Sequence, residues 1–574
     1  MKNLFSLPPA GKLALQAILA YGWLTVLSPL AVSDTYYSVY LLCGVFGLLC
    51  LLDNHRAGVP QQGRRTAAFF GAVFACAVAL ANYALFEPLS VLQNLFDLVC
   101  VFLGGWVVGD QILLAMLRRL PLSRKCGNRK HPNRVFWVVF ASIGVIDLTY
   151  LFFALYPGVL TTDSFSTIGQ ILGTEPYNNT MPFWHTVTVE PFVELGLALF
   201  EDINGAIALY HAAQALFMAA CFAYAIVTMY QAGVPAWFML AVFGIYAFMP
   251  YNIVYSVTLW KDIPFAGAGV LFVTALYRLL KGIGRRKINI CVFALGALGF
   301  SLWRTNGWYA FLVMTMLMFL MLRKTHKQLL VMMVSVLVVC WVLINPVLSF
   351  LNVGATNLAE AFAVPMQQIA RVLHEERELT QEEKALLSEI FWIDKTGQVY
   401  DPQTVDPVKF ETFRYDKVDY LAAHKGEYFK LYFSLGARYP GDYLKAWVEE
   451  TKGYWNGGYK YWTYTLQMGE NGFGIYQTPG ENIIARLYAA LFRYLEKPAV
   501  LQWTVSIGLH VWALVSCCVV NAVKKREEFL LTIPILVLMA GLWLGTPVFA
   551  EWRYAYPLIL TMPVILATTC FTPE

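Results

Sequence analysis

The stretch LLVMMVSVLVVCWVLINPVLSF, residues 329–350, contains no charged residue and decides the fold class of this chain. An apolar run of about 18 residues or more is long enough to cross the hydrocarbon core of a bilayer as a helix. We expect each such run to be helical, because an unpaired backbone amide in hydrocarbon costs several kcal/mol. Similar runs recur along the chain, so the sequence predicts an all-α, multi-pass membrane protein.

We predict about fourteen transmembrane helices from these runs, with the first run retained as an anchor and not cleaved as a signal peptide. The predicted spans cover residues 12–31, 36–53, 66–86, 90–117, 135–155, 205–230, 235–256, 263–280, 288–303, 308–322, 329–350, 501–523, 529–547 and 555–571.

Basic residues between the spans predict the orientation. The basic loops contain His55 to Arg65, Arg118 to Arg134, Lys281 to Lys287, Arg323 to Lys327, and Lys524 to Arg526. All five loops fall on one side if the N-terminus is cytoplasmic, as the positive-inside rule requires. The other loops are then predicted to face outside.

Composition excludes several classes of protein. The chain is 58% hydrophobic and only 14% charged, whereas soluble domains carry about a quarter charged residues. The net charge of +5 comes from short basic loops, so no nucleic-acid partner is expected. The sequence contains no CxxC pair, so neither a disulfide framework nor a zinc site is predicted. The phosphate-binding signature GxxxxGK[ST] is absent, so no nucleotide-hydrolysing motor is predicted.

The spans divide the chain into four predicted domains. Residues 1–134 form a four-helix membrane segment, and residues 135–351 form a seven-span core with an external loop, 156–204. Residues 352–500 are polar and long enough for a mostly helical soluble domain on the outer side. Residues 501–574 return to the membrane.

Ionisable side chains recur at span ends on the predicted outer side. Asp163 closely follows the span 135–155, and Lys261 and Asp262 directly precede an apolar run. Arg304 lies in a tight turn between two apolar runs. Ionisable groups in such places are functional candidates. The full candidate set is Asp163, His185, Glu190, Lys261, Asp262, Arg304, Asn306, Glu551, Arg553 and Tyr554.

Carboxylates beside lysine and arginine suit chemistry on a lipid-linked phosphate. A leaving phosphate develops negative charge that cationic groups or a metal ion stabilise, and a carboxylate accepts the proton of an acceptor hydroxyl. We predict Asp163 as the catalytic base, with Lys261, Arg304 and Arg553 binding the donor phosphate. Asp163 and Asp262 are the candidate ligands of a divalent cation, Mg²⁺ or Mn²⁺, the one cofactor considered. The predicted supporting or substrate-binding residues are Asp262, His185, Glu190, Glu551, Tyr554 and Asn306.

Structural roles compete with these assignments. Charges at span ends also anchor helices at the membrane interface, and a packed loop position is slightly favoured for His185 over a ligand or proton donor. The aromatic stretch YWNGGYKYW, residues 454–462, is equally typical of a surface that stacks on sugar rings and of an interfacial belt.

The order of these features resembles the GT-C superfamily of membrane glycosyltransferases, which use polyprenyl-phosphate-linked sugars. The shared order is an acidic residue in an early external loop, an interfacial stretch (here 191–200), core spans, an external domain and further spans. The resemblance covers about residues 135–571.

Within that superfamily the chain looks most like an uncharacterised bacterial family with three short motifs. These are Pro-Gly-x-x-x-x-Asp-Ser, Trp-Lys-Asp and Arg-x-Asn-Gly, which stand here at 157–164, 260–262 and 304–307. The Glu-x-Arg-Tyr turn at 551–554 is similar to turns of lipid-linked mannosyl- and aminoarabinosyltransferase-type enzymes. Two departures are the four additional N-terminal spans and the lack of a second acidic residue beside Asp163, which leaves metal dependence open.

The resemblance implies an inverting glycosyltransferase of the bacterial cytoplasmic membrane with its active site facing outside. It would move a sugar from a polyprenyl-phosphate donor to an external glycan, lipid or protein hydroxyl, with Asp163 as base and Lys261, Asp262 and Arg304 at the donor phosphate. A transporter or flippase of polysaccharide or lipid-linked glycan is the alternative class, although no inverted repeat is visible. A surface-polymer polymerase or ligase, with catalysis centred on arginine, is the other.

Overall fold

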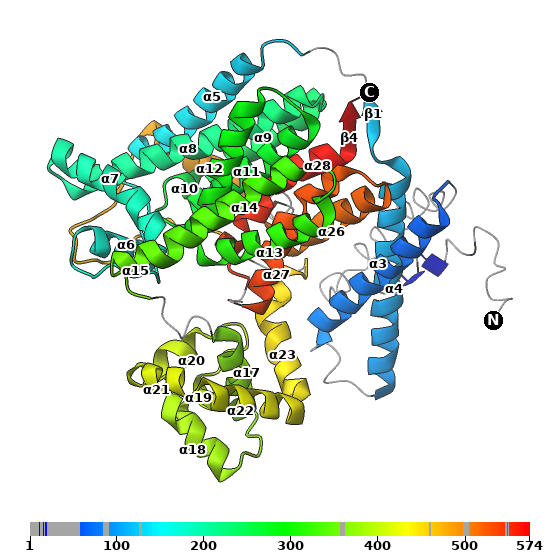
Figure 1. The fold of residues 1–574 in the computed structure, drawn as a ribbon, viewed down its shortest axis with the longest axis vertical. Coiled ribbons are helices and arrows are strands. Elements are labelled where there is room, and N and C mark those ends of the chain that lie inside the picture. Colours follow the sequence, from blue (N-terminus) through cyan, green and yellow to red (C-terminus); the bar gives the residue numbers. More distant parts are fainter. Residues whose placement is uncertain are drawn as a thin grey trace. The chain divides into compact units, whose positions relative to one another are not determined.

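The computed structural model describes residues 58–83, 91–124, 129–355, 362–457, 461–496, 504–545, 548 and 550–573, with five further residues between 11 and 19. The chain forms two compact units, one of Met1–Leu122 with Val515–Phe529 and one of Ser123–Leu514 with Leu530–Glu574. The first unit thus ends before residue 134, the predicted boundary, and takes in part of the C-terminal region. Figure 1 shows that helices build both units.

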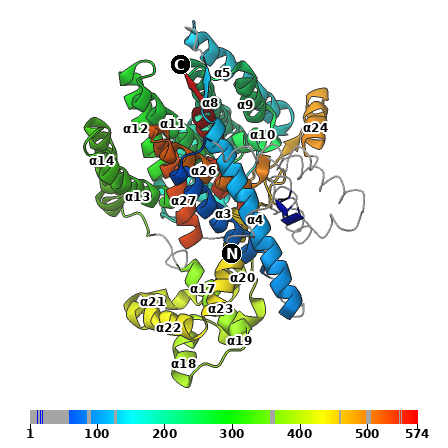
Figure 2. The same ribbon diagram turned by 90° about the vertical axis from the view of Figure 1, so that its right-hand side faces the viewer.

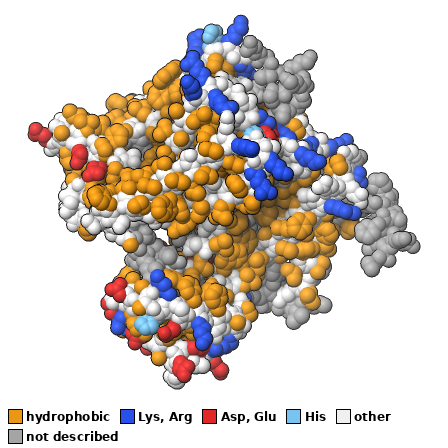
Figure 3. Space-filling model, viewed as in Figure 1, with side chains coloured by type: hydrophobic (Ala, Val, Ile, Leu, Met, Phe, Trp, Pro, Cys, Tyr) orange, Lys and Arg blue, Asp and Glu red, His pale blue; other side chains and the backbone are white. Residues whose placement is uncertain are grey.

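Eight of the described helices are long and apolar enough to cross a membrane, or nine if one bent pair counts as a span. The chain is therefore an all-α protein of the membrane-spanning type, and Figure 3 shows the broad hydrophobic surface of its helices. The eight are α3 (Gln61–Ala81), Val101–Arg119 of α4 (Val91–Arg119), α5 (Pro132–Phe153), α8 (Ile203–Gln231), α11 (Asp262–Lys281), α13 (Thr305–Leu322), Lys327–Phe350 (α14, Lys327–Val342; η3, Leu343–Val347; α15, Leu348–Phe350) and Glu527–Leu544 (η6, Glu527–Leu531; α27, Ile533–Leu544).

The predicted number of about fourteen spans is not confirmed. The predicted spans 12–31 and 36–53 lie almost wholly outside the described residues. Three other predicted spans are helices shorter than the 18 residues of the shortest candidate span. These are α12 (Arg286–Leu302, 17 residues), α26 (Ile507–Val523, 17 residues) and α28 (Tyr556–Cys570, 15 residues).

The predicted span 235–256 is a broken helix. It consists of α9 (Ala236–Phe248) and α10 (Pro250–Ser256), which are bent by 52° relative to each other. Pro250 has no backbone N–H, so it cannot continue the hydrogen bonds of α9. Met249, the residue before it, has an extended conformation, which residues before proline prefer.

In the first unit, α3 and α4 pack closely at two glycines. A Cβ added at Gly109 would lie 2.9 Å from the Cα of Gly71, and one added at Gly71 would lie 2.5 Å from the carbonyl oxygen of Trp106. Small residues at such contacts let helix backbones approach each other. The indole of Trp106 adds a hydrogen bond to the carbonyl of Ala68, at 2.8 Å.

The helix α11 lies at the centre of the second unit and is buried along most of its length. It packs against α8, α12 and α28, and Figures 1 and 2 both show α11 and α12 side by side. Stacked rings of Phe265 and Phe272 on α11 and Phe300 on α12 fill the contact. This packing fixes the N-terminus of α11 next to the turn that precedes α28.

The described part of the predicted external domain 352–500 begins with a helical subdomain that has its own hydrophobic core. Leu387, Phe391, Val408 and Leu435 are among its buried residues, and charged side chains of both signs cover its surface (Figure 3). Its elements are α17 (Ala363–His374), α18 (Gln381–Ile390), α19 (Ile393–Val399), α20 (Asp406–Glu411), η4 (Tyr415–Lys417), α21 (Val418–Ala423), α22 (Lys425–Arg438) and α23 (Pro440–Thr451).

The described residues 461–496 of the predicted external domain pack on the core. Strand β3 (Thr478–Pro479) pairs antiparallel with β2 (Leu155–Tyr156), and Ile475 is buried among Leu160, Ile168 and Leu259. The helix α24 (Ile483–Leu495) contacts α5 through Tyr488, whose hydroxyl donates to the carbonyl of Ile146 at 2.7 Å. The remaining elements are β1 (Leu122–Arg124), α6 (Thr162–Ile171), α7 (Phe183–Phe200), η5 (Lys452–Tyr454), η7 (Trp552–Ala555) and β4 (Phe571–Pro573).

Candidate functional site

Backbone pairing brings the Asp163 loop to the start of α11. The N–H of Val159 donates to the carbonyl of Val257 at 2.8 Å, and the N–H of Leu259 donates to the carbonyl of Val159 at 3.0 Å. The two segments therefore run side by side as a short parallel bridge between Val159 and Thr258. A few residues further along each segment, Asp163 and Lys261 come together.

Ser164 holds the first turn of α6, which carries Asp163. Its hydroxyl accepts a hydrogen bond from the N–H of Thr161 at 2.9 Å and donates to the carbonyl of Leu259 at 2.7 Å. One side chain thus caps the helix and ties it to the segment before α11. Asp163 lies in that first turn, where the helix dipole favours a negative charge.

Gly158 lets the Asp163 loop pass close to α8 and to the segment before α11. Its φ of +115° lies in the region that only glycine adopts readily, and an added Cβ would lie 2.2 Å from Nδ1 of His211 and 2.5 Å from the carbonyl oxygen of Val257. His211 is hydrogen-bonded through Nδ1 to the carbonyl of Pro157 at 2.6 Å. Gly158 of the Pro-Gly motif is therefore explained by its backbone conformation and its close neighbours, without a role in catalysis.

Asp163 forms ion pairs with two cations from distant parts of the chain. Its Oδ2 lies 3.1 Å from Nζ of Lys261 and 3.1 Å from Nη1 of Arg553. The side chain of Asp163 is 29% exposed, while those of Lys261 and Arg553 are 15% and 16% exposed. The carboxylate is thus accessible to a ligand but faces two nearly buried positive charges.

A second, deeper pair lies beside the first. Nη1 of Arg304 contacts Oδ1 of Asp262. Asp262 is the first residue of α11, and its side chain is fully buried. Oδ2 of Asp262 has no hydrogen-bond partner among the described residues and lies 4.0 Å from Nε of Arg553. We call Asp163, Lys261, Asp262, Arg304, Glu551 and Arg553 the charged cluster.

Aromatic rings hold the guanidinium groups of the charged cluster. The guanidinium carbon of Arg304 lies 3.8 Å from the ring centroid of Tyr554, and that of Arg553 lies 4.8 Å from Trp260 and 5.3 Å from Tyr554. Stacking on an aromatic face stabilises a cation most where water is excluded. The indole of Trp260 is itself held by a 2.6 Å hydrogen bond to the hydroxyl of Thr161.

The pKa values of two carboxyl groups in the cluster, those of Asp163 and Glu551, are shifted in opposite directions. Burial raises the pKa of Asp163, but the positive charges of Lys261 and Arg553 outweigh burial and hold this pKa well below its usual range. Burial raises the pKa of Glu551, even though its Oε1 lies 3.1 Å from Nε of Arg553. Asp163 is therefore the ionised carboxylate at the exposed edge of the cluster.

The structure brings seven of the ten predicted site residues together: the six members of the charged cluster and Tyr554. His185 is buried, and burial first and the positive charge of Lys261 second lower its pKa to about 3. Its Nε2 has no hydrogen-bond partner among the described residues. Asn306 lies in the first turn of α13, two residues after Arg304.

Glu190 is hydrogen-bonded to a residue outside the charged cluster. Its Oε1 accepts a hydrogen bond from the hydroxyl of Tyr177 at 2.7 Å, and it makes no ion pair with the cluster among the described residues. The prediction that Glu190 supports the site thus gains nothing from the structure. The predicted interfacial stretch 191–200 belongs to the same helix, α7, which begins earlier, at Phe183.

Sequence reasoning did not assign a site role to Trp260 or Met181. Trp260 stacks on Arg553, and Sδ of Met181 lies 3.4 Å from Nζ of Lys261. The adjacency of Trp260 to Lys261 was a usable signal. Met181 lies 80 residues from Lys261 in the chain, and no local pattern marks it.

Both interpretations of the aromatic stretch 454–462, stacking on sugar rings and an interfacial belt, need exposed rings, and the first two rings of the stretch are buried. Tyr454 is fully buried and donates to the carbonyl of Val548 at 2.9 Å, and Trp455 is buried against α23. Trp462 at the other end is 58% exposed, and its ring centroid lies 6.5 Å from that of Trp260. Trp462 is therefore an exposed ring beside Trp260, which stacks on Arg553 of the charged cluster. Residues 458–460 lie outside the described part.

A divalent cation does not fit the site as it stands. The described residues contain no group of three or more His, Cys, Asp or Glu side chains placed to hold a metal ion. Asp163 and Asp262, the two predicted ligands, each already contact a cationic side chain. A metal would have to displace these contacts, so we derive no step through one.

Comparison with known proteins places the chain in a family. The model of a family of unknown function (DUF6020) matches residues 176–572, and the chain belongs to this family. No curated protein and no solved structure matches the chain.

Proposed function

We propose that this member of DUF6020 is an inverting glycosyltransferase that moves a sugar from a polyprenyl-phosphate donor to a hydroxyl of an external cell-envelope acceptor. One observation carries the proposal, namely the contact of the partly exposed Asp163 carboxylate with Lys261 and Arg553. Acid–base catalysis on a phosphate-linked sugar needs a carboxylate and cationic groups within reach of one another.

The cationic side of the cluster supports a phosphate as the leaving group. Lys261, Arg304 and Arg553 supply three positive charges, and two of them are guanidinium groups held by aromatic rings. Planar guanidinium groups match phosphate oxygens with paired N–H donors. Because the low exposure of these side chains excludes water, their charges act more strongly on a bound anion than they would in solution.

Asp163 is a weak base while both cations contact it, because its pKa lies well below the usual range. A donor phosphate would compete for the N–H groups of Lys261 and Arg553. Their withdrawal from Asp163 raises its pKa toward the ordinary value of about 3.9 and strengthens it as a base. Donor binding would therefore prepare the carboxylate for the acceptor.

The residues of the charged cluster can account for the proton, the bonds and the charge of the transfer step. Asp163 accepts the proton of the acceptor hydroxyl while that oxygen forms a bond to the anomeric carbon. The bond from the anomeric carbon to the phosphate oxygen breaks, and the electron pair leaves with the polyprenyl phosphate. Lys261, Arg304 and Arg553 stabilise the negative charge that develops on it. Attack opposite the leaving group inverts the anomeric carbon.

The test is release of polyprenyl phosphate from a panel of labelled polyprenyl-phosphate sugars by the purified full chain with membrane acceptor, with and without chelator. We expect Asp163→Asn to lower the rate by about 10²–10⁴-fold, the usual contribution of a general base, with donor binding retained. Glu194→Gln, a change at an exposed carboxyl on α7, is the matched control and should keep full activity.

Full turnover by Asp163→Asn would remove the base assignment. Movement of intact labelled lipid across a proteoliposome membrane, without bond cleavage, would instead identify a flippase. Loss of turnover with chelator would show that a divalent cation takes part despite the cationic surroundings of both carboxylates.

A further inference from the structure

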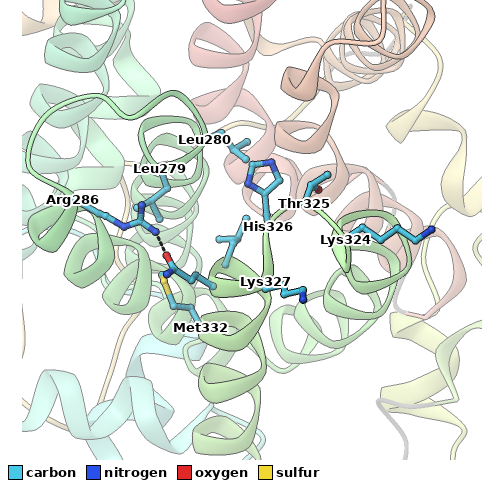
Figure 4. A pocket seen from close by; sticks show the side chains of 10 residues that line it. Leu279, Leu280, Arg286, Lys324, Thr325, His326, Lys327 and Met332 are labelled. Carbon is cyan, nitrogen blue, oxygen red and sulfur yellow. Dashed lines mark hydrogen bonds between the residues drawn. The ribbon is translucent and has the colours of Figure 1, made fainter.

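A second polar site lies at the other end of α11 from the charged cluster. This helix runs from Asp262 to Lys281 and has 20 residues, which corresponds to about 30 Å along the axis. There a cavity of about 390 Å³ lies between the end of α11, the start of α12 and the turn from α13 to α14 (Figure 4). Its lining residues are Leu279, Leu280, Arg286, Lys324, Thr325, His326, Lys327, Gln328, Leu329 and Met332.

The polar part of this cavity is cationic. Arg286, Lys324, Lys327 and His326 line it, and none of the lining residues is acidic. Within the described residues, Arg286, Lys324 and Lys327 form no ion pair with a carboxylate. Figure 4 shows Arg286 on one side of the cavity, hydrogen-bonded through Nη2 to Oε1 of the neutral Gln328. Among the described residues, no carboxylate thus neutralises the charge of these three side chains.

Two helix N-termini add to this positive potential. The helices α12 and α14 begin at Arg286 and Lys327, at the cavity. Neither helix has an acidic residue in its first turn or a side-chain cap on its N–H groups. Uncapped N–H groups carry partial positive charge and are ready donors to a bound anion.

The remaining wall is apolar. Leu279, Leu280, Leu329 and Met332 line the same cavity. A free inorganic anion gains nothing from such side chains, whereas the glycerol and first methylene groups of a lipid would bury apolar surface against them. The combination of an uncompensated cationic rim with an apolar wall matches a phosphate group that carries a hydrocarbon tail.

We propose that this cavity binds the phosphate group of an anionic membrane lipid. The loops 281–287 and 323–327 are those that the positive-inside rule predicts to be cytoplasmic, where anionic lipid head groups are attracted to basic residues. The site is separate from the charged cluster, so it does not depend on the proposed transferase activity. Free phosphate shares the same chemistry and is distinguished by the test.

The experiment measures lipid binding to the purified full chain in detergent by native mass spectrometry and by thermal unfolding. The ligands are phosphatidylglycerol, phosphatidylcholine and inorganic phosphate. The test variant is Arg286→Gln/Lys324→Gln/Lys327→Gln. The matched control is Arg285→Gln/Lys287→Gln/Arg323→Gln, which removes the same charge from exposed residues of the same loops that do not line the cavity.

We expect phosphatidylglycerol to bind the wild type and the control variant and to raise their unfolding temperature. The cavity variant should bind it about tenfold or more weakly, because three of the cationic contacts are lost. Its unfolding temperature without lipid should stay near that of the control, since the three substituted side chains are exposed.

Equal weakening in both variants would show unspecific attraction to basic loops and would overturn the proposal. Equal affinity for phosphatidylcholine would overturn it as well. Protection by millimolar inorganic phosphate that matches the lipid effect would make free phosphate the ligand, and the lipid assignment would then be wrong.

Discussion

At the scale of single residues, Asp163 differs from a general base that is ready to act. It contacts Lys261 and Arg553 at 3.1 Å each, and these charges lower its proton affinity. The arrangement keeps the carboxylate ionised and in place until a ligand takes over its cationic partners. The low pKa is therefore compatible with a base whose strength depends on the donor.

The ion pairs of Asp163 should stabilise the folded chain in a pH-dependent way. Because the folded-state pKa lies below the unfolded value of about 3.9, the stabilisation is present above about pH 4. It is lost as the pH falls toward the folded-state pKa. We expect Asp163→Asn to lower the unfolding temperature at pH 7 and to have a smaller effect at pH 3, where part of the stabilisation is already lost. An equal effect at both values would contradict the ion-pair assignment.

We expect a large coupling free energy between Asp262 and Arg304, because both side chains of this ion pair are buried. Loss of one partner of a buried ion pair costs about 3–5 kcal/mol, because the other charge is left without a partner. We expect Arg304→Met to be strongly destabilising and the double variant with Asp262→Asn to recover a large part of the loss.

A double-mutant cycle of equilibrium unfolding in detergent measures this coupling, which we expect to exceed about 1 kcal/mol. The control pair is Lys395 with Glu411, whose side chains are 51% and 49% exposed. Exposed pairs couple by less than about 1 kcal/mol. Equal coupling in the two cycles would show that the Asp262 pair is not shielded from water.

At the scale of elements, the loop 155–161 is positioned mainly by backbone contacts. It pairs with β3 on one side and with residues 257–259 on the other. Gln477 adds a hydrogen bond from Nε2 to the carbonyl of Gly158 at 2.9 Å. The position of Asp163 thus depends on three segments that are far apart in the sequence.

Gly158→Ala should disrupt this loop. The added methyl group would clash with His211 and with the carbonyl of Val257, and the backbone conformation disfavours any residue with a Cβ. Gly173→Ala is the control, since Gly173 has a φ of +72° but open space around its Cβ position. We expect the control to lose only about 1–2 kcal/mol.

Folded yield by size-exclusion chromatography and the unfolding temperature distinguish the two glycine variants. Gly158→Ala should yield little folded protein, whereas Gly173→Ala should yield nearly as much as the wild type. Equal yields would mean that the loop can move away from α8 and that the close approach is not required.

At the scale of the whole molecule, the two proposals are linked by the side of the membrane that each site is predicted to face. The charged cluster is predicted to face outside and the cationic cavity to face the cytoplasm. Both sites are anchored by α11, one at each end. The membrane side of either site therefore determines that of the other.

The side of the membrane that each site faces can be tested with single cysteines introduced into a variant that lacks the native cysteines. We expect a cysteine at Glu382, exposed on α18, to react with an impermeant maleimide in intact cells. A cysteine at Lys287 should react only after the membrane is opened. The reverse pattern would place the charged cluster inside and remove the argument for a lipid-linked sugar donor.

Much of the fold could be predicted from local sequence patterns. Apolar runs predicted the helices α5, α8, α11 and α13 because every backbone amide in hydrocarbon must pair within its own helix. The break between α9 and α10 was missed, although Pro250 was a visible signal. The packing of residues 461–482 on the Asp163 loop could not be predicted, because extended segments take their conformation from their neighbours.

The sequence by itself determined the helical membrane class of this protein and the short motifs that carry its charges, because both depend on composition within a few neighbouring residues. Only the tertiary structure decided which charges pair. Asp163 and Arg553 are 390 residues apart in the chain yet share a hydrogen bond. Ion pairing acts over a few ångströms, so it depends on how helices pack and not on their order in the sequence.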